Sequence, residues 1–184
     1  MKKTVLLALL ILAAGTPMRA ESDFDLFFKN SDDYADVLIT EVRSAHHFTI
    51  KNAHNEKEII RLIGLKAPEP PRHKKVDTEY DSYGFPVKPD IDVEVPLEEK
   101  AFNFARELLE GKHVRLEFDS TKKNDEAQTL AYVFLIDEGT FVNAEILRQG
   151  FAHLQIRPPN TKYSKELRAA YQEARREKRG LQGL

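Results

Sequence analysis

The residues best suited to chemistry are Arg61 and Glu69, which lie near the two ends of one short segment. Residues 59–69 read Ile-Ile-Arg-Leu-Ile-Gly-Leu-Lys-Ala-Pro-Glu, an apolar run that contains one arginine and that a proline ends. Residues 59–65 have the length and β-branched content of a strand buried on both faces. A guanidinium in such a strand needs an anionic partner, because burying an unpaired charge is costly. The two residues therefore predict either a phosphate site or a structural Arg61–Glu69 ion pair.

The N-terminus has the pattern of an export signal. Lys2 and Lys3 precede an apolar stretch, residues 4–14, that is too short to span a bilayer comfortably, and Ala20 is a small residue before an expected cleavage point. We therefore predict a signal peptide over residues 1–20, with an uncleaved membrane anchor as the alternative. After its removal no transmembrane segment is expected, and the protein is expected to be secreted or periplasmic in a bacterium.

Composition limits the classes of function. The 184 residues support one domain with a modest core, and the absence of cysteine means that stability must come from packing. Loss of residues 1–20 would remove two lysines and one arginine, which moves the formal net charge from −2 to about −5. A mildly acidic chain lacks the basic surface of a general nucleic-acid binder.

The remaining chain is predicted to form one α+β domain. An acidic leader, residues 21–36, precedes a domain over residues 37–184 that contains a long proline-studded loop, residues 70–96. Alternation and turn signals predict five strands, at residues 37–43, 48–52, 58–65, 114–118 and 130–135. Helical periodicity predicts three helices, at residues 97–110, 142–149 and 164–178. A three-stranded meander, a helix and two further strands is the order of a five-stranded OB-type β-barrel.

Six separated blocks, taken together, resemble the staphylococcal nuclease (thermonuclease) family. The first is Arg-Leu-Ile-Gly-Leu-Lys-Ala-Pro-Glu at residues 61–69. The others follow in the family's order at residues 108–119, 130–134, 141–152, 158–163 and 173–181. The resemblance covers residues 37–181. It implies an OB barrel with three helices and, in active members, calcium-dependent hydrolysis of DNA and RNA.

The resemblance also implies a set of site residues, which this chain matches only in part. Arg61 matches one of two arginines that stabilise the charge of the transition state, and Glu69 matches the glutamate that positions or activates water. The two aspartates that hold calcium in active members fall on His46 and Lys66, and the second arginine falls on Gln128. The tyrosines that flank the nucleotide fall on Gln155 and Arg157.

These replacements argue against the family's metal chemistry. An ammonium about 4 Å from a divalent ion costs about 8 kcal/mol at an effective dielectric of 20. The imidazole of His46 suits zinc or copper better than calcium. His46 and His47 could form half of a transition-metal site with Glu69 or His73, but adjacent residues on a hairpin usually point to opposite sides. We therefore predict two solvent-facing histidines, no bound metal and no cofactor, with Lys66 paired to Glu69.

Three functions remain open from the sequence. The leading hypothesis is an exported, catalytically degenerate domain that binds nucleic acid or protein. Arg72, Lys74 and Lys75 are the candidates for contact with phosphate, and the alternative for them is a solvated loop without a ligand. The second hypothesis is an active phosphodiester hydrolase that uses Arg61 and Glu69 with a different metal or with none. The third is a protein-interaction module, whose binding would survive moderate salt. The sequence leaves open whether the chain is an enzyme and what its oligomeric state is.

Overall fold

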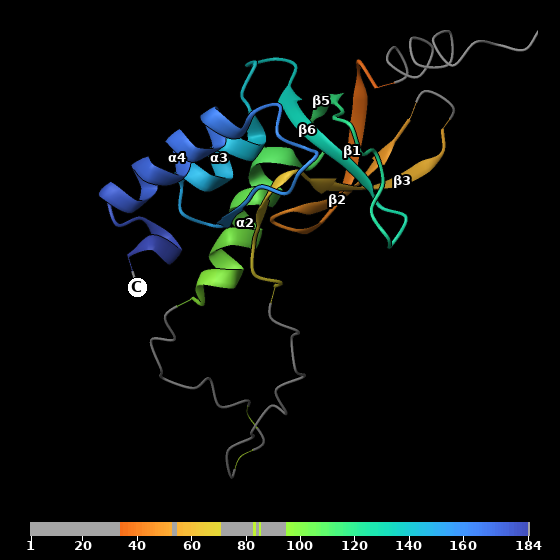
Figure 1. Cartoon of the computed structure of the whole chain (residues 1–184). Helices are drawn as coiled ribbons and strands as arrows, with labels where there is room; N and C mark the ends of the chain where they lie inside the picture. Colours follow the sequence, from red (N-terminus) through yellow and green to blue (C-terminus); the bar gives the residue numbers. More distant parts are fainter. Residues whose placement is uncertain (1–33, 53–54, 71–82, 84, 86–94, 184) are drawn as a thin grey trace, which may run out of the picture.

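The computed structural model describes residues 34–52, 55–70, 83, 85 and 95–183 (Figure 1). The predicted signal peptide, most of the acidic leader and most of the predicted loop at residues 70–96 lie outside these residues. So do Arg72, Lys74 and Lys75, whose phosphate contact stays a prediction.

Five strands close into a barrel, as the alternation predicts. They are β1 (Val37–Ser44), β2 (His47–Lys51), β3 (Lys57–Leu62), β5 (His113–Glu117) and β6 (Thr129–Leu135). The hydrogen-bonded order is β1-β2-β3-β6-β5, and β1 also pairs with β5. β3 and β6 run parallel, whereas the other neighbours are antiparallel. The predicted OB-type α+β fold is confirmed.

Three helices surround the barrel: α2 (Leu97–Leu109), α3 (Val142–Arg148) and α4 (Ser164–Arg176), followed by the 3-10 turn η1 (Gly180–Gln182). α3 and α4 pack against each other on one side, and α2 packs against β1 (Figure 1). Ser164 begins α4 but does not cap it, since Tyr163 is the N-cap residue. Among the described residues, none of the helices has the length and apolar composition needed to cross a bilayer.

The predicted third strand, residues 58–65, is two strands. β3 ends at Leu62, and β4 (Gly64–Lys66) leaves the barrel to pair with β7 (His153–Gln155). Gly64 has a φ of 87°, which favours glycine, and a Cβ there would lie 2.3 Å from Leu167 Cδ1, so the Leu167 side chain would have to shift. The prediction of burial on both faces is also wrong, because Ile59 is 36% exposed while Ile60 is fully buried.

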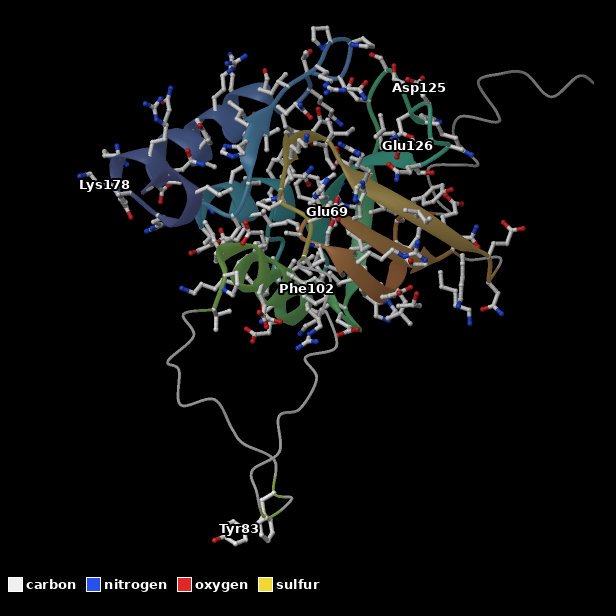
Figure 2. The ribbon with its side chains drawn as sticks, turned by 90° about the horizontal axis from the view of Figure 1, so that it is seen from below. Glu69, Tyr83, Phe102, Asp125, Glu126 and Lys178 are labelled. Atoms are coloured by element: carbon white, nitrogen blue, oxygen red, sulfur yellow. The ribbon has the colours of Figure 1, made fainter. Side chains whose placement is uncertain are left out.

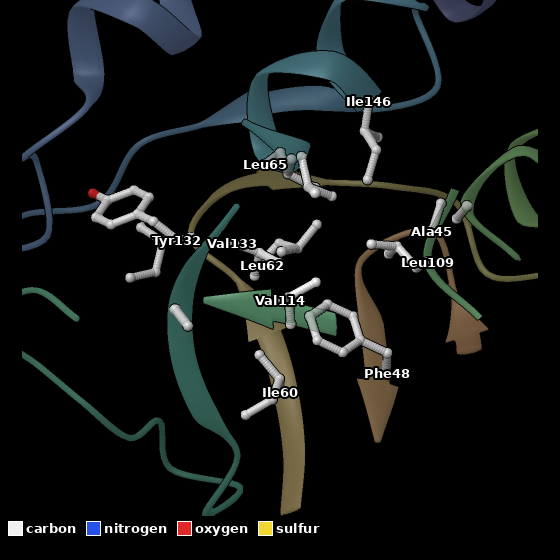
Figure 3. Close-up of a cluster of buried hydrophobic side chains, with 14 of the residues drawn as sticks. Ala45, Phe48, Ile60, Leu62, Leu65, Leu109, Val114, Tyr132, Val133 and Ile146 are labelled. Atoms are coloured by element: carbon white, nitrogen blue, oxygen red, sulfur yellow. The ribbon is translucent and has the colours of Figure 1, made fainter. Parts of the chain in front are cut away.

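The core fills the barrel and extends under the helices (Figure 3). Phe48, Ile60 and Val114 project into the barrel and are fully buried. Leu65 and Ile146 continue the core between the barrel and α3. The inner faces of the barrel strands are therefore closely packed. This packing restrains the backbone of the strands and so the positions of the side chains on their outer faces.

A charged cluster fastens the segment before α4 to the barrel. Glu117 Oε2 accepts hydrogen bonds from Lys162 Nζ and from the Tyr163 hydroxyl, both at 2.6 Å, and its other oxygen pairs with Arg115. Burial alone would raise the pKa of Glu117, but these hydrogen bonds lower it from 4.5 to about 2. The carboxylate is 20% exposed, so solvent screens part of the interaction.

We expect Glu117→Gln to lower the free energy of unfolding at pH 7 by about 2 kcal/mol. A carboxylate with a depressed pKa stabilises the fold above its unfolded pKa and loses this contribution as pH falls. The difference between the wild-type protein and the variant should therefore shrink between pH 4.5 and about 2. Urea unfolding across this range measures it. A constant difference at all pH values would contradict the assignment.

Candidate functional site

The turn between β1 and β2 and the first residue of β2 place the rings of His46 and His47 side by side, and His46 lines a cleft. His46 is only 2% exposed, and the two ring centroids lie 4.1 Å apart. The prediction of two solvent-facing histidines on opposite sides is wrong. His46 lies in the turn, where strand alternation does not hold, and the pairing of β1 with β2 shifts register between Val42 and Ser44. Ser44 Oγ lies 3.3 Å from Nδ1 of each ring and so orients both.

Glu69 approaches the two histidines from the segment after β4. Its Oε1 lies 3.6 Å from His47 Nδ1 and 3.8 Å from His46 Nε2. Ala67 is buried and Pro68 ends the pairing, so the chain turns back over the cleft with the Glu69 side chain 65% exposed. The predicted Lys66–Glu69 ion pair does not form among the described residues.

Arg61 enters the site from the other side of His47. The two residues are register partners across β2 and β3, and Arg61 Nη1 donates to His47 Nε2 at 3.2 Å. Since a guanidinium only donates, His47 Nε2 is the acceptor. In the described part of the chain no carboxylate pairs with Arg61, so the predicted structural pair with Glu69 is not observed. Arg61 is half-buried, and none of the described carboxylates forms an ion pair with its guanidinium.

His46, Arg61 and Glu69 line a cleft of about 440 Å³. Its walls come from residues 61–66, from residues 124–126 and from the end of β7 and the segment after it, which carry Gln155 and Arg157. Seen from below, Glu69 lies between α2 and the loop that carries Asp125 and Glu126 (Figure 2). Positive and negative side chains balance along the cleft: Arg61, Lys66 and Arg157 against Glu69, Asp125 and Glu126.

Gln128 is held by a loop that sequence reasoning missed. Asn124 Oδ1 accepts from the backbone N–H groups of Glu126 and Gln128 at 3.1 and 2.9 Å. Asn124 Nδ2 donates to Gln128 Oε1 at 2.8 Å. Asn124 followed by an aspartate is a common turn signal and could have located this loop, although not its place in the cleft. The loop brings the carboxylates of Asp125 and Glu126 to the cleft.

Both imidazoles are neutral at pH 7. Burial, and then the neighbouring His47, Arg61 and Lys66, lower the pKa of His46 to about 3. Burial and the Arg61 charge also lower the pKa of His47, while Glu69 opposes them. Each ring therefore offers one nitrogen lone pair to a donor or to a metal ion.

The residues at this site do not fit calcium. Calcium takes six to eight oxygen ligands, mostly carboxylates and carbonyls. The positions that the resemblance assigns to its aspartates hold a buried imidazole at His46 and an ammonium at Lys66, and Arg61 adds a second cation to the cleft. Of the residues predicted for the site, Glu69 alone supplies carboxylate oxygen here.

Comparison with known proteins agrees with this fold. The family model described as "Staphylococcal nuclease homologue" matches residues 59–182. The chain is 34% identical over 121 residues to a thermonuclease of Staphylococcus intermedius, covering 66% of this chain and 61% of that protein. It is 29% identical over 126 residues to a thermonuclease of Staphylococcus hyicus, covering 68% and 63%.

A third relative is endonuclease YncB of Bacillus subtilis (strain 168), 30% identical over 145 residues, which are 77% of this chain and 60% of that protein. The chain thus spans about three fifths of the length of these curated relatives. The family match covers the barrel from β3 onward, all three helices and the cleft residues Arg61 and Glu69. The chain belongs to the family of staphylococcal nuclease homologues.

Proposed function

We propose that this nuclease-like domain binds single-stranded nucleic acid through the cleft, with Arg61 as the phosphate anchor, and has lost calcium-dependent hydrolysis. The observation that carries the proposal is the half-buried Arg61, which none of the described carboxylates neutralises. A partly desolvated guanidinium gains most from an anion that it can bind with two parallel hydrogen bonds, and a phosphodiester is such an anion.

The activities named for the relatives support a phosphodiester as the anion. Two are thermonucleases and one is an endonuclease. Gln128 is neutral and held by Asn124, so it does not supply the second positive charge that the family's chemistry uses. These features favour binding without cleavage. The apolar segment at residues 4–14 supports placing this binding outside the cytoplasm.

Charge balance in the cleft sets the expected strength and salt dependence of binding. Three cations line it, so at most three phosphates are neutralised. For single strands the logarithm of the binding constant falls with the logarithm of salt concentration with a slope of about −0.7 per phosphate, so the slope should lie between about −1 and −2. A slope near zero would favour a protein partner.

Replacement of Arg61 tests the anchor. We expect Arg61→Ala to weaken binding of a fluorescein-labelled single-stranded DNA by about tenfold. A hydrogen bond to a charged group contributes about 1.5 to 3 kcal/mol, and the lower end of this range corresponds to about a tenfold change in affinity. The salt slope should shrink by about 0.7. Fluorescence anisotropy at several salt concentrations measures both, and Arg175→Ala, on the exposed end of α4, is the matched control. Equal binding by Arg61→Ala and wild type would sink the proposal.

Hydrolysis without calcium is the second candidate, and one observation favours it. The Glu69 carboxylate stays exposed at the cleft, and a single imidazole, His47, separates it from Arg61. A general base and a charge stabiliser therefore still face the same space. A nuclease assay without metal and with manganese, magnesium or zinc tests this candidate, with Glu69→Ala as the control for contaminating nuclease. Activity that Glu69→Ala abolishes would establish it.

A further inference from the structure

Three potential ligand atoms converge where the cleft meets the β1–β2 turn. His46, His47 and Glu69 each offer one atom, and these atoms all lie within 4.8 Å of one another. The His46 imidazole comes from the β1–β2 turn, the His47 imidazole from the first residue of β2, and the carboxylate from the segment after β4, so the tertiary fold brings them together. His46 is almost fully buried, and its Nε2 lies too far from Glu69 Oε1, at 3.8 Å, for a hydrogen bond.

We propose that His46, His47 and Glu69 bind one transition-metal ion of the zinc class, through one nitrogen from each ring and one carboxylate oxygen. This goes beyond the proposed function and does not depend on it, since metal binding needs no nucleic acid.

The donor set selects the class of ion. Neutral imidazole nitrogen suits zinc, copper, nickel and iron(II), whereas calcium and magnesium prefer oxygen ligands. Two histidines and one carboxylate are a known protein ligand set for zinc, in which a fourth position stays open to water or substrate. The open position here would face the cleft that Arg61 and Lys66 line.

The distances already approach those of a bound ion. Two ligands at about 2.1 Å from a tetrahedral zinc ion lie about 3.4 Å apart. Glu69 Oε1 is 3.6 Å from His47 Nδ1 and 3.8 Å from His46 Nε2. The ligand atoms of the two rings lie within 4.8 Å of each other, so completing the site needs a movement of the His47 ring as well as of Glu69, whose side chain is 65% exposed.

Two neighbouring cationic side chains are expected to lower the affinity of the site for a divalent metal ion. Lys66 and Arg61 line the same cleft and repel a divalent ion, whereas Glu69 attracts it. Lys66 is exposed and can turn into solvent. Removing either cation should therefore tighten metal binding, and removing a ligand should weaken it.

Metal binding also changes the role of Arg61. If His47 binds the ion through Nδ1, the proton of its ring moves to Nε2, which now accepts a hydrogen bond from Arg61 Nη1. Two donors would then face each other, so the guanidinium must leave His47. A metal ion would thus free Arg61 for an anion in the cleft.

Zinc titration by isothermal calorimetry and the visible absorption of the cobalt(II) form test the site on the purified, tag-free protein. We expect one tight equivalent in the wild type, at least a tenfold weaker affinity in Glu69→Gln and His46→Ala, and at least a threefold tighter affinity in Lys66→Ala. His113→Ala is the matched control, because His113 is an exposed histidine on β5 that pairs with Asp36 away from the cleft. Its zinc affinity should equal that of the wild type.

Glu69→Gln keeps the test valid if His46→Ala fails to fold, because Glu69 is exposed and bears little on packing. The proposal is overturned if the wild type binds no zinc or cobalt, if Glu69→Gln binds as tightly as wild type, or if His113→Ala alone loses the ion. Each of these results leaves the Arg61-dependent binding of nucleic acid to be judged by its own assay.

Discussion

With calcium and single-stranded DNA, the wild-type chain is expected to cleave at least about 1,000-fold more slowly than the triple variant His46→Asp, Lys66→Asp, Gln128→Arg. The loss of one group that stabilises transition-state charge typically costs 100- to 1,000-fold in rate. The missing calcium adds to this, because Lys66 repels a divalent ion and the His46 imidazole is a poor calcium ligand. Initial rates on a fluorogenic single strand measure the difference.

Two controls isolate the site in this experiment. Adding Glu69→Gln to the triple variant should abolish the gained activity, because the resemblance assigns Glu69 to the attacking water. Circular dichroism must show that the triple variant is folded, since position 46 is only 2% exposed and an aspartate there is desolvated. Wild-type cleavage within tenfold of the triple variant would show that the chain is a calcium nuclease after all.

The largest loss of stability is expected from Asn143→Ala. Asn143 lies on α3 and is fully buried. Its Oδ1 accepts from Val133 N–H at 2.9 Å, and its Nδ2 donates to the carbonyls of Ile63 and Ala131 at 2.9 and 3.3 Å. Alanine would remove these partners from the Val133 N–H and the Ile63 carbonyl, whereas the Ala131 carbonyl keeps its hydrogen bond from the Ile63 N–H at 3.0 Å. Each unsatisfied group costs about 1 to 3 kcal/mol. We expect a loss of about 4 kcal/mol in the free energy of unfolding, or about 10 °C in Tm.

Differential scanning calorimetry measures this change. The matched control is Asn103→Ala on α2, because that amide makes none of the hydrogen bonds found among the described residues, and the change should stay within about 0.5 kcal/mol. If Asn143→Ala melts within 2 °C of wild type, the hydrogen bonds that Asn143 makes to the backbone do not stabilise this fold as described.

The elements of the fold could be predicted because their signals are local. Alternation located β5 and β6, and helical periodicity with a closing glycine located α2 and α3 to within one or two residues. The break between β3 and β4 was missed because residues 59–65 form one apolar run. What divides it is Gly64, whose close contact with Leu167 belongs to the tertiary structure.

The site could be predicted in composition but not in arrangement. Arg61 and Glu69 follow from a motif, and the structure brings both to the cleft. Their predicted pairing is not observed, because the ring of His47 lies between them and contacts each. The orientation of that ring depends on a turn and on a register shift between β1 and β2. Neither feature produces a periodic pattern of apolar residues from which it could be predicted.

The pairing of β4 with β7 makes the cleft depend on two segments that are far apart in the sequence. Lys66 pairs with His153, so one wall of the cleft waits for a segment far along the chain, and closing so large a loop costs entropy before any contact is gained. A nascent chain released before residue 153 could close the barrel strands β1, β2, β3, β5 and β6 and still lack Gln155, Arg157 and Asn160 from its cleft. The ability to bind a ligand in the cleft therefore depends on a segment that the barrel itself does not need.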